Sequence, residues 1–314
     1  MPHTPFFSVA IAVYNKEKYI VETMESVLAQ DFDDFEVVVV DDGSTDRSME
    51  LIKNMKNDRI RIFTQENQGA SAARNHAIAK CSGKYIALID ADDLWTQHHL
   101  SDIKELIQTF PEAQLFATHY EVMYTPHYKV EANYSVEISK RTVMIDDYFA
   151  GSMQRSLITS SSVAFTREAF EKAGKFAPDI KSGEDTDLWI RLTLEYPLAF
   201  HLRNSTTYRS FAENNLTSQL LVEESSKLLN KYKEQEQSNP SLQKFMNMNR
   251  FAVAIYAKLG SNDKIFRLIL PEISKEDLNF TQRLLLKMPS KMLILMKKWQ
   301  LWLNSKRIYL TAWD

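Results

Sequence analysis

Short apolar runs recur along the first hundred residues and are separated by polar turns. Residues 7–13, 35–40 and 85–89 are mainly Val, Ile, Ala, Phe and Tyr, and residues 59–64 alternate Arg with Ile, so that four strands are predicted. The run 35–40 is too continuously apolar for a strand with one face in water. We therefore expect it to be buried on both faces of a sheet.

Helical periodicity fills the gaps between these runs. Apolar residues at 19–20, 23–24 and 27–28 predict an amphipathic helix, and residues 71–80 predict an Ala-rich one. Ser44, in the turn after the second run, is expected to cap a further helix that continues to about Lys56. Three β–α units in series imply a parallel sheet with helices on both faces.

The pattern changes beyond Pro111. Longer alternating segments at 114–124, 127–138 and 157–165 predict more strands, a helix is predicted at 184–196, and we expect this α+β half to complete the same sheet. From about Gln219 the pattern is almost entirely helical. The predicted organisation is a first unit at 1–217, with halves 1–100 and 101–217, and a helical C-terminal extension at 218–314.

Composition and charge narrow the class of protein. The 314 residues are 44% hydrophobic and 25% charged with a net charge of −3, which excludes a disordered or collagen-like chain. The single cysteine, Cys81, excludes an intramolecular disulfide and is typical of a reducing compartment. The longest stretch without charge, residues 1–15, is too short for a membrane span and has no basic start, so we expect a cytoplasmic chain without signal peptide.

Polar side chains follow each predicted parallel strand, where such sheets bind ligands. The acidic clusters Asp41-Asp42 and 90–93 should converge on one rim, although a single cluster could merely turn the chain and cap the next helix. Crowded carboxylates repel one another unless a cation lies among them. Oxygen ligands without Cys or a His pair suit Mn²⁺ or Mg²⁺, which commonly bridges to a phosphorylated substrate.

The common phosphate-binding loops are absent. No G-x-G-x-x-G follows the first strand and no G-x-x-x-x-G-K-[ST] occurs, which argues against a dinucleotide dehydrogenase and a P-loop enzyme. A nucleotidyltransferase is a weaker alternative, because Tyr14-Asn15-Lys16 stands where a Gly-rich loop is expected. Arg74 could hold a diphosphate, although a surface salt bridge explains its position equally well.

Four ordered segments together resemble family 2 inverting glycosyltransferases of the GT-A fold. They are residues 8–15 (SVAIAVYN), 35–46 (FEVVVVDDGSTD), 67–75 (NQGASAARN) and 85–93 (YIALIDADD). The resemblance covers about residues 6–217 and leaves the extension outside. It implies a Rossmann-like α/β fold with a mixed sheet flanked by helices, in which 1–100 is the nucleotide-binding half and 101–217 the acceptor-binding half of a catalytic domain.

The resemblance also implies roles for individual residues. The nucleotide-binding residues would be Ala12, Tyr14, Asp42, Arg74 and Asp90, with Tyr14 against the base and Asp42 at the base or ribose. Asp92 would be the metal ligand of the Asp90-Ala91-Asp92 motif. In the segment 183–189, Asp185 would be the catalytic base, with Glu184 and Trp189 on the acceptor side.

These residue types suit the chemistry of sugar transfer. A divalent cation stabilises the charge that builds on a leaving diphosphate, and the incoming hydroxyl needs a carboxylate to accept its proton. Without the resemblance, the simpler interpretation is that Glu184 and Asp185 complement the N-terminal end of a helix. The Ser160–Ser162 segment would lie near the acceptor or allow tight packing, and the adjacent His98 and His99 would be packing or solvated residues.

Two departures from the family pattern bear on the activity. Phe211 stands where a metal-binding His is often found, and the Gln-x-x-Arg-Trp motif of processive synthases is absent. The sequence predicts a metal-dependent, inverting transfer of one sugar from a UDP-sugar to a saccharide or lipid-linked acceptor, as in bacterial surface-polysaccharide synthesis, and no nucleic-acid partner. The alternative is a catalytically degenerate GT-A module that binds nucleotide-sugar or membrane without turnover.

The end of the chain has a pattern of its own. Residues 281–314 carry a net charge of +6. One apolar helical face is formed there by Met292, Leu295, Met296, Trp299, Trp302 and Leu303. Trp with flanking Lys is typical of helices in a membrane interface, although the face could instead pack on the catalytic domain or a second subunit. We expect peripheral attachment through residues 289–310 to the inner face of the cell membrane.

Overall fold

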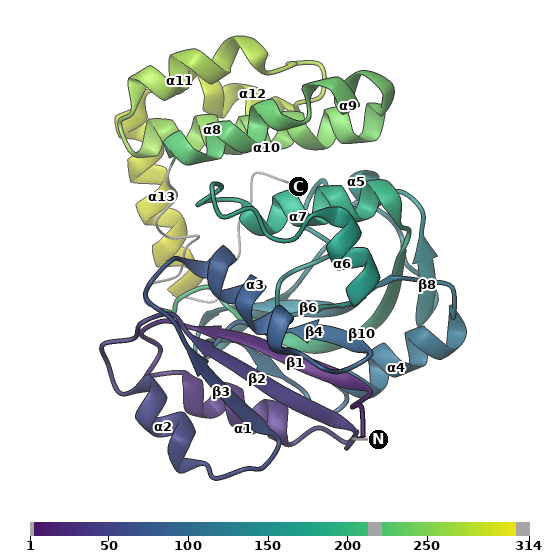
Figure 1. Cartoon of the computed structure of the whole chain (residues 1–314). Coiled ribbons are helices and arrows are strands. Elements are labelled where there is room, and N and C mark those ends of the chain that lie inside the picture. The colour runs from purple at the N-terminus through teal and green to yellow at the C-terminus, as the bar shows by residue number, and fades with distance from the viewer. Residues whose placement is uncertain (1–2, 213–221, 306–314) are drawn as a thin grey trace.

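One mixed sheet organises the computed structural model, which describes residues 3–212 and 222–305 (Figure 1). Its first part is parallel, in the order β3-β2-β1-β4, and consists of β1 (Phe7–Val13), β2 (Phe35–Asp41), β3 (Ile60–Thr64) and β4 (Tyr85–Leu88). The sheet continues through β9 (Val163–Thr166), β6 (Leu115–Thr125), β10 (Leu198–Arg209) and β5 (Leu94–Trp95). Two short strands flank this path, β7 (Tyr128–Glu131) beside β6 and β8 (Thr142–Ile145) beside β10. The expected α/β architecture with a mixed sheet is confirmed.

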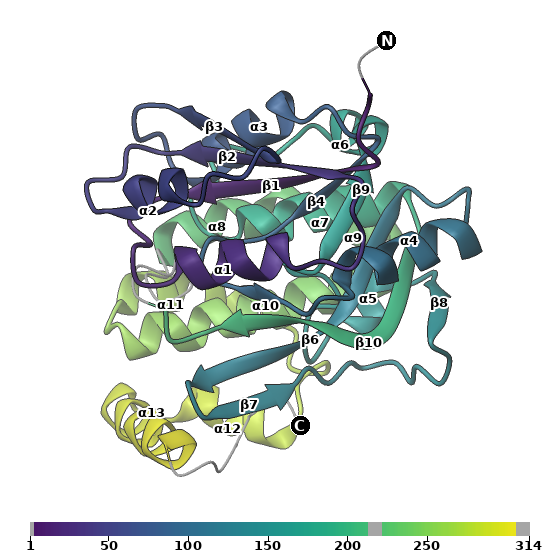
Figure 2. The same ribbon diagram turned by 90° about the horizontal axis from the view of Figure 1, so that it is seen from below.

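Helices cover both faces of the sheet, and alternating strand residues explain why. In β2, Val37 and Val39 pack with α1 (Ile20–Leu28) and α4 (His99–Thr109). Val38 and Val40 point to the other face, which holds α3 (Ala70–Lys80), α6 (Arg167–Ala173) and α7 (Glu184–Glu195). Figure 2 shows α1 and α4 together on one side of the strands. The expectation that the second strand is buried on both faces is confirmed.

The helix after β2 begins later than predicted. It is α2 (Ser48–Asn54), and Asp46 Oδ1 accepts a hydrogen bond from the Ser48 amide at 2.9 Å. Ser44 is not its cap, because the Ser44 hydroxyl accepts from the Asn15 amide at 3.1 Å. Ser44 thus binds the turn after β1 through Asn15, and α2 begins four residues later, at Ser48.

Two strands predicted in the second half are shorter than their alternating patterns suggested. The segment 127–138 contains only β7, and 157–165 contributes only the beginning of β9. Before β9 the chain turns instead of pairing, since the Thr159 amide donates to Ser162 Oγ at 3.0 Å and the Ser162 amide to the Thr159 carbonyl at 3.1 Å. Such local hydrogen bonds compete with a ladder.

The C-terminal region is helical, as expected, and lies against one face of the sheet unit. Its elements are α8 (Val222–Lys231), α9 (Lys233–Ser238), α10 (Pro240–Leu259), α11 (Asp263–Ile269), the 3-10 turn η2 (Leu270–Glu272), α12 (Phe280–Lys287) and α13 (Ser290–Ser305). Phe245 of α10 packs on Phe149 of α5 (Tyr148–Gly151), with ring centroids 5.6 Å apart. The boundary predicted at 217 lies outside the described residues.

None of the described helices combines the length and apolarity that a membrane crossing requires.

Candidate active site

A cavity of about 470 Å³ opens where β1, β4 and β10 end, between α3 and the first turn of α7. Its wall includes all nine predicted site residues: Ala12, Tyr14, Asp42, Arg74, Asp90, Asp92, Glu184, Asp185 and Trp189. Residues more than 170 positions apart in the chain therefore share one cavity. The two acidic clusters meet at one rim because parallel strands end on the same edge.

Arg74 joins the two halves of the cavity. Its guanidinium donates to Asp90 Oδ1 at 2.7 Å and to Glu184 Oε1 at 2.9 Å, and its side chain is only 11% exposed. The alternative of a surface salt bridge is wrong, because the Arg74 side chain is buried and its ion pair with the buried Glu184 joins residues 110 positions apart. A buried guanidinium between two carboxylates keeps its charge, since their fields outweigh desolvation and raise the pKa of Arg74.

Lys16 is the counter-ion of Asp92. Its ammonium lies 2.5 Å from Asp92 Oδ2, and both side chains are about nine-tenths buried. Burial raises the pKa of Asp92, and the Lys16 charge opposes that rise. The residue predicted as the metal ligand is thus neutralised by a lysine from the loop after β1.

Asp93 is buried behind this rim. It accepts hydrogen bonds from the Ser161 hydroxyl at 2.5 Å and from the Arg209 amide at 2.8 Å. Burial, with Asp92 and Asp90 nearby, raises the pKa of Asp93 well above its usual range. Ser161 also accepts from the Asp90 amide at 3.0 Å, so this serine holds the acidic motif rather than an acceptor, whereas Ser160 lines the cavity.

Asp42 shapes the loop that precedes α3. One of its oxygens accepts from the Gln68 amide at 2.9 Å and from Gln65 Nε2 at 2.8 Å, and the other accepts from the Gly69 amide at 2.8 Å. A carboxylate has about four acceptor positions, so three are already used by the protein. Asp42 therefore holds the loop before α3 in place at the cavity. Its carboxylate can accept about one further hydrogen bond.

The first turn of α7 brings a second carboxylate pair to the opposite wall. Glu184 is buried, and burial together with the adjacent Asp185 raises the pKa of Glu184 to about 7 against the opposing charge of Arg74. Asp185 is more open, and its Oδ1 accepts from the Thr186 amide at 2.6 Å. Of the two carboxylates, Asp185 is the one that a substrate hydroxyl can approach more freely.

The remaining wall is aromatic and polar. Tyr120, Arg155 and Tyr208 come from β6, from the segment before β9 and from β10. Trp189 is almost fully buried, and among the described residues its indole N–H has no hydrogen-bond acceptor. An unmet buried donor beside a cavity suits a substrate with hydroxyl or carbonyl groups.

The donor set fits a hard divalent cation. Asp90 and Asp92 offer carboxylate oxygens at the cavity wall, and their charges are balanced here by Arg74 and Lys16. A cation at Asp92 would take over the balancing role that the Lys16 ammonium has in this arrangement.

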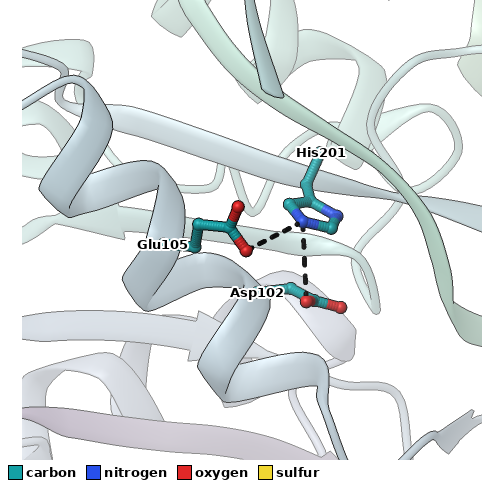
Figure 3. A group of neighbouring side chains, drawn as sticks. All are labelled: Asp102, Glu105 and His201. Atoms are coloured by element: carbon teal, nitrogen blue, oxygen red, sulfur yellow. Dashed lines mark ion pairs between the residues drawn. The ribbon is translucent and has the colours of Figure 1, made fainter. Parts of the chain in front are cut away.

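A second acidic group lies away from the cavity, at the start of β10. Asp102, Glu105 and His201 are close neighbours there (Figure 3). Arg203 donates two hydrogen bonds to Asp102, and Arg141 donates to Glu105 at 2.8 Å and to His201 Nε2 at 3.1 Å. Two guanidinium groups already neutralise the carboxylates, so the cluster is an ion-pair network that joins α4 to β10.

The two adjacent histidines after β5 are a solvated and a packing residue, as predicted. His98 is half-exposed and bonds Asp31 at 2.7 Å, whereas His99 is buried and stacked on Trp95 with ring centroids 4.0 Å apart. Neither residue lines the cavity.

Several cavity residues were not predicted from the sequence. Lys16 and Arg155 carry charge on the wall, yet neither has a sequence signal of its own, and Asp93 was part of the acidic cluster 90–93 without a role of its own. Lys16 follows the Tyr14-Asn15 segment directly, and that adjacency is the one clue the chain offers. Arg155 lies in an irregular segment whose position depends on how β6 and β9 pair.

Comparisons with known proteins show the family and the fold of the chain. The model of the family described as "Glycosyl transferase family 2" matches residues 8–173, more than half of the chain. An "Uncharacterized glycosyltransferase" of Rickettsia bellii is 37% identical over 189 residues, which are 59% of this chain and 26% of that protein. The putative teichuronic acid biosynthesis glycosyltransferase TuaG of Bacillus subtilis is 27% identical, over 68% of this chain and 82% of its own.

The matches cover 30% or less of the length of three rickettsial relatives. Two solved structures share the fold. Residues 1–349 of S. aureus TarS in complex with UDP-GlcNAc have a TM-score of 0.65 at 18% identity, covering 96% of this chain and 91% of that one. The mannosyltransferase PcManGT from Pyrobaculum calidifontis, in complex with GDP-Man and Mn²⁺, has a TM-score of 0.55 at 18% identity, covering 96% and 88%.

Proposed function

This chain belongs to glycosyltransferase family 2 and has the GT-A fold, and from that premise we propose that it is a metal-dependent, inverting glycosyltransferase. It transfers one sugar from a UDP-sugar to a hydroxyl of a saccharide or lipid-linked saccharide. The observation that carries the proposal is the cavity itself, which joins the acidic rim of the first half to Asp185 across the buried Arg74.

The nucleotide side of the cavity suits a donor with a base, a ribose and a diphosphate. Tyr14 is 43% exposed and offers a ring face to the base, while Ala12 leaves room beside it. Arg74 and Lys16 supply positive charge on the same wall. TarS was solved with UDP-GlcNAc, a donor of this class.

Asp92, with Asp90 beside it, would hold a Mn²⁺ or Mg²⁺ ion, and the bound ion would supply Lewis-acid stabilisation of the leaving diphosphate. Asp185 accepts the proton of the attacking hydroxyl, because it is the more open carboxylate on the opposite wall. Glu184 keeps Arg74 in position, and Trp189 donates its indole N–H to the acceptor. A single displacement from the face opposite the diphosphate inverts the anomeric configuration.

The acceptor side supports a polysaccharide pathway as the setting. Tyrosine side chains and Arg155 line that wall, and aromatic faces bind sugar rings. TuaG is named for teichuronic acid biosynthesis. The proposed location is the cytoplasmic face of the cell membrane, where lipid-linked acceptors are available.

Helix α13 supports contact with that membrane. Its buried Leu293 and Leu303 pack inward, so Leu303 does not belong to the outward face that was predicted. The exposed apolar residues are Met292, Leu295, Met296, Trp299 and Trp302, from 41% to 68% exposed. Exposed Lys291, Lys297 and Lys298 accompany them, and Phe280 of the neighbouring α12 is 82% exposed.

The position of α13 matches this role. Figure 1 shows α13 on the side of the molecule where β1 and β2 end, which is also where the cavity lies. The remainder of the predicted segment, residues 306–310, lies outside the described residues. An acceptor held in the membrane would thus be near the cavity.

The proposed function is tested by transfer and hydrolysis of UDP-sugars by the wild type and Asp185→Asn. We expect metal-dependent turnover in the wild type, and a loss of about 10²–10⁴-fold in kcat with unchanged UDP binding in the variant, because the substitution removes a proton acceptor and little volume. NMR of the product should show an inverted anomeric centre.

Two results would contradict this function. Equal turnover by the variant would remove Asp185 as the base. UDP-sugar binding without turnover against any acceptor or water would favour the catalytically degenerate module instead.

A further inference from the structure

Helix α8 of the C-terminal region lies directly against the start of α7, which carries the proposed base. The Ser225 hydroxyl donates to Ser182 Oγ at 3.2 Å, one residue before the N-cap Gly183. Leu228 follows three residues later, and Lys231 and Tyr232 follow after another turn. This spacing places Ser225, Leu228 and Lys231 on one side of α8, and Tyr232 follows directly after the helix, so one row of side chains faces α7.

Gly183 shows how close this contact is. Its φ of +81° is a conformation that side chains with a Cβ adopt at a cost, and a Cβ placed there would be 2.9 Å from Leu228 Cδ2. The α8 side chain therefore rests on the backbone immediately before Glu184 and Asp185. Little room is left for the turn to shift toward α8.

Asp187 is the centre of the polar part of the contact. Its carboxylate is fully buried and accepts from Lys231 Nζ at 2.6 Å, from the Tyr232 hydroxyl at 2.6 Å and from Arg191 Nη2 at 2.6 Å. The Tyr232 hydroxyl is also 3.1 Å from the Asp187 carbonyl oxygen. Two of the three side chains that satisfy this buried carboxylate thus come from outside the catalytic unit, at 44 and 45 residues' distance in sequence.

We propose that α8 and Tyr232 hold the first turn of α7, and with it Asp185, at the distance from the donor that transfer requires. Lys231 and Tyr232 are then positioning residues of the transfer step, and the end of α8 acts on that step through Asp187. This inference rests on the proposed role of Asp185. Its physical basis is that a displacement of about 1 Å in a reacting group can cost about 10²-fold in rate.

Lys231→Met and Tyr232→Phe test the proposal in the full chain. We expect kcat to fall about 10-fold to 100-fold, with the KM of the donor and the UDP affinity by calorimetry within about twofold of the wild type. Lys231→Arg retains the cation and should recover most of the lost kcat.

Lys258→Met is the matched control. It removes the same side chain from the same helical region, where Lys258 Nζ donates to the carbonyls of Leu286 and Met288 at 2.7 and 2.5 Å. It should lower Tm by a similar amount and leave kcat within about twofold. An equal loss of kcat in Lys258→Met and Lys231→Met would overturn the proposal, since the effect would then follow stability alone.

Hydrogen exchange gives a readout that does not depend on activity. Amides 184–188 should exchange faster in Tyr232→Phe than in the wild type and in Lys258→Met. Unchanged exchange there would also overturn the proposal. If exchange rises while Asp185→Asn keeps full turnover, the contact holds α7 as described but Asp185 is not the base, which separates failure of the proposed function from failure of the contact.

Discussion

At the scale of single residues, the cavity is defined by how each carboxylate is neutralised. Asp90 and Glu184 share Arg74, whereas Asp92 has Lys16 at 2.5 Å. A lysine on a loop can move away from its partner more easily than a guanidinium that is held by two carboxylates. The oxygens of Asp92 are therefore the ones most readily made available to an incoming cation.

Lys16→Met should strengthen metal binding, because it removes the charge that competes with the ion for Asp92. We expect an increase of about 10-fold in Mn²⁺ affinity by calorimetry, and a decrease in Asp92→Asn. Lys53→Met, which removes an exposed lysine from α2, should have no effect. Equal UDP affinity of the wild type in EDTA and in Mn²⁺ would count against a metal at this site.

Glu184 gives the stability of the protein a distinct pH dependence. Its pKa is about 7 in the folded chain and about 4.5 when unfolded, so the folded state binds more protons between these values. Its contribution to the free energy of unfolding should fall as the pH rises from about 4.5 to 7 and then level off. Urea unfolding of the wild type and Glu184→Gln at pH 5, 6, 7 and 8 measures this as a decrease, with rising pH, of the free energy of unfolding of the wild type minus that of the variant. A difference independent of pH would contradict the raised pKa.

At the scale of elements, α13 has two apolar sides, of which one is buried against the chain and the other is exposed. Leu293 and Leu303 are buried and attach it to the chain, and the outward side keeps two tryptophans exposed. A patch of this size with lysines at its edges is unusual for a surface that meets only water. The packing and membrane alternatives are therefore compatible, since they use different sides of one helix.

The chain should co-sediment with anionic liposomes, and Leu295→Gln/Trp299→Gln should reduce that binding about 10-fold or more while leaving Tm unchanged. The reason is that both side chains are more than half exposed and offer apolar area to a membrane or another partner. Added salt or neutral lipid should weaken binding, because the lysines act through charge. Equal sedimentation of both proteins would identify the face as a contact for another protein surface.

At the scale of the whole molecule, the C-terminal helices and the sheet share one core. Leu228, Leu242 and Phe245 pack in the same apolar cluster as Phe149 and Leu188. Such a shared core couples the stability of the two parts. The C-terminal helices from α8 onward are therefore packed with the sheet unit into one body.

The full chain should unfold in a single cooperative transition, and a chain of residues 1–217 should be less stable or insoluble. Removal of the helices would expose the apolar faces of α5 and α7. Each aromatic or leucine side chain that loses its burial lowers the free energy of unfolding by about 1.5–3 kcal/mol. Calorimetry and the yield of soluble protein measure both outcomes. A stable 1–217 chain with wild-type Tm would show that the two parts fold independently.

Much of this molecule could be predicted from residues that are neighbours in sequence. The buried strand β2 follows from an unbroken apolar run, and the rim of Asp42, Asp90 and Asp92 follows from polar residues placed where parallel strands end. These features depend on local periodicity and on the geometry that every parallel sheet shares. The chain alone therefore determined the fold class and the acidic rim of the cavity.

Tertiary structure decided which charges meet. From the sequence, Arg74 could equally have been a surface residue, whereas in the structure it lies 2.9 Å from Glu184. Likewise, nothing in the sequence indicates that Lys16 faces Asp92. Tertiary packing also brings Lys231 and Tyr232 to Asp187, because these residues are 44 and 45 positions apart from it in sequence. It decides in the same way which side of α13 is buried. Local sequence leaves these pairings open because many partners satisfy a charged or apolar side chain equally well, and only the packing of the whole chain selects one.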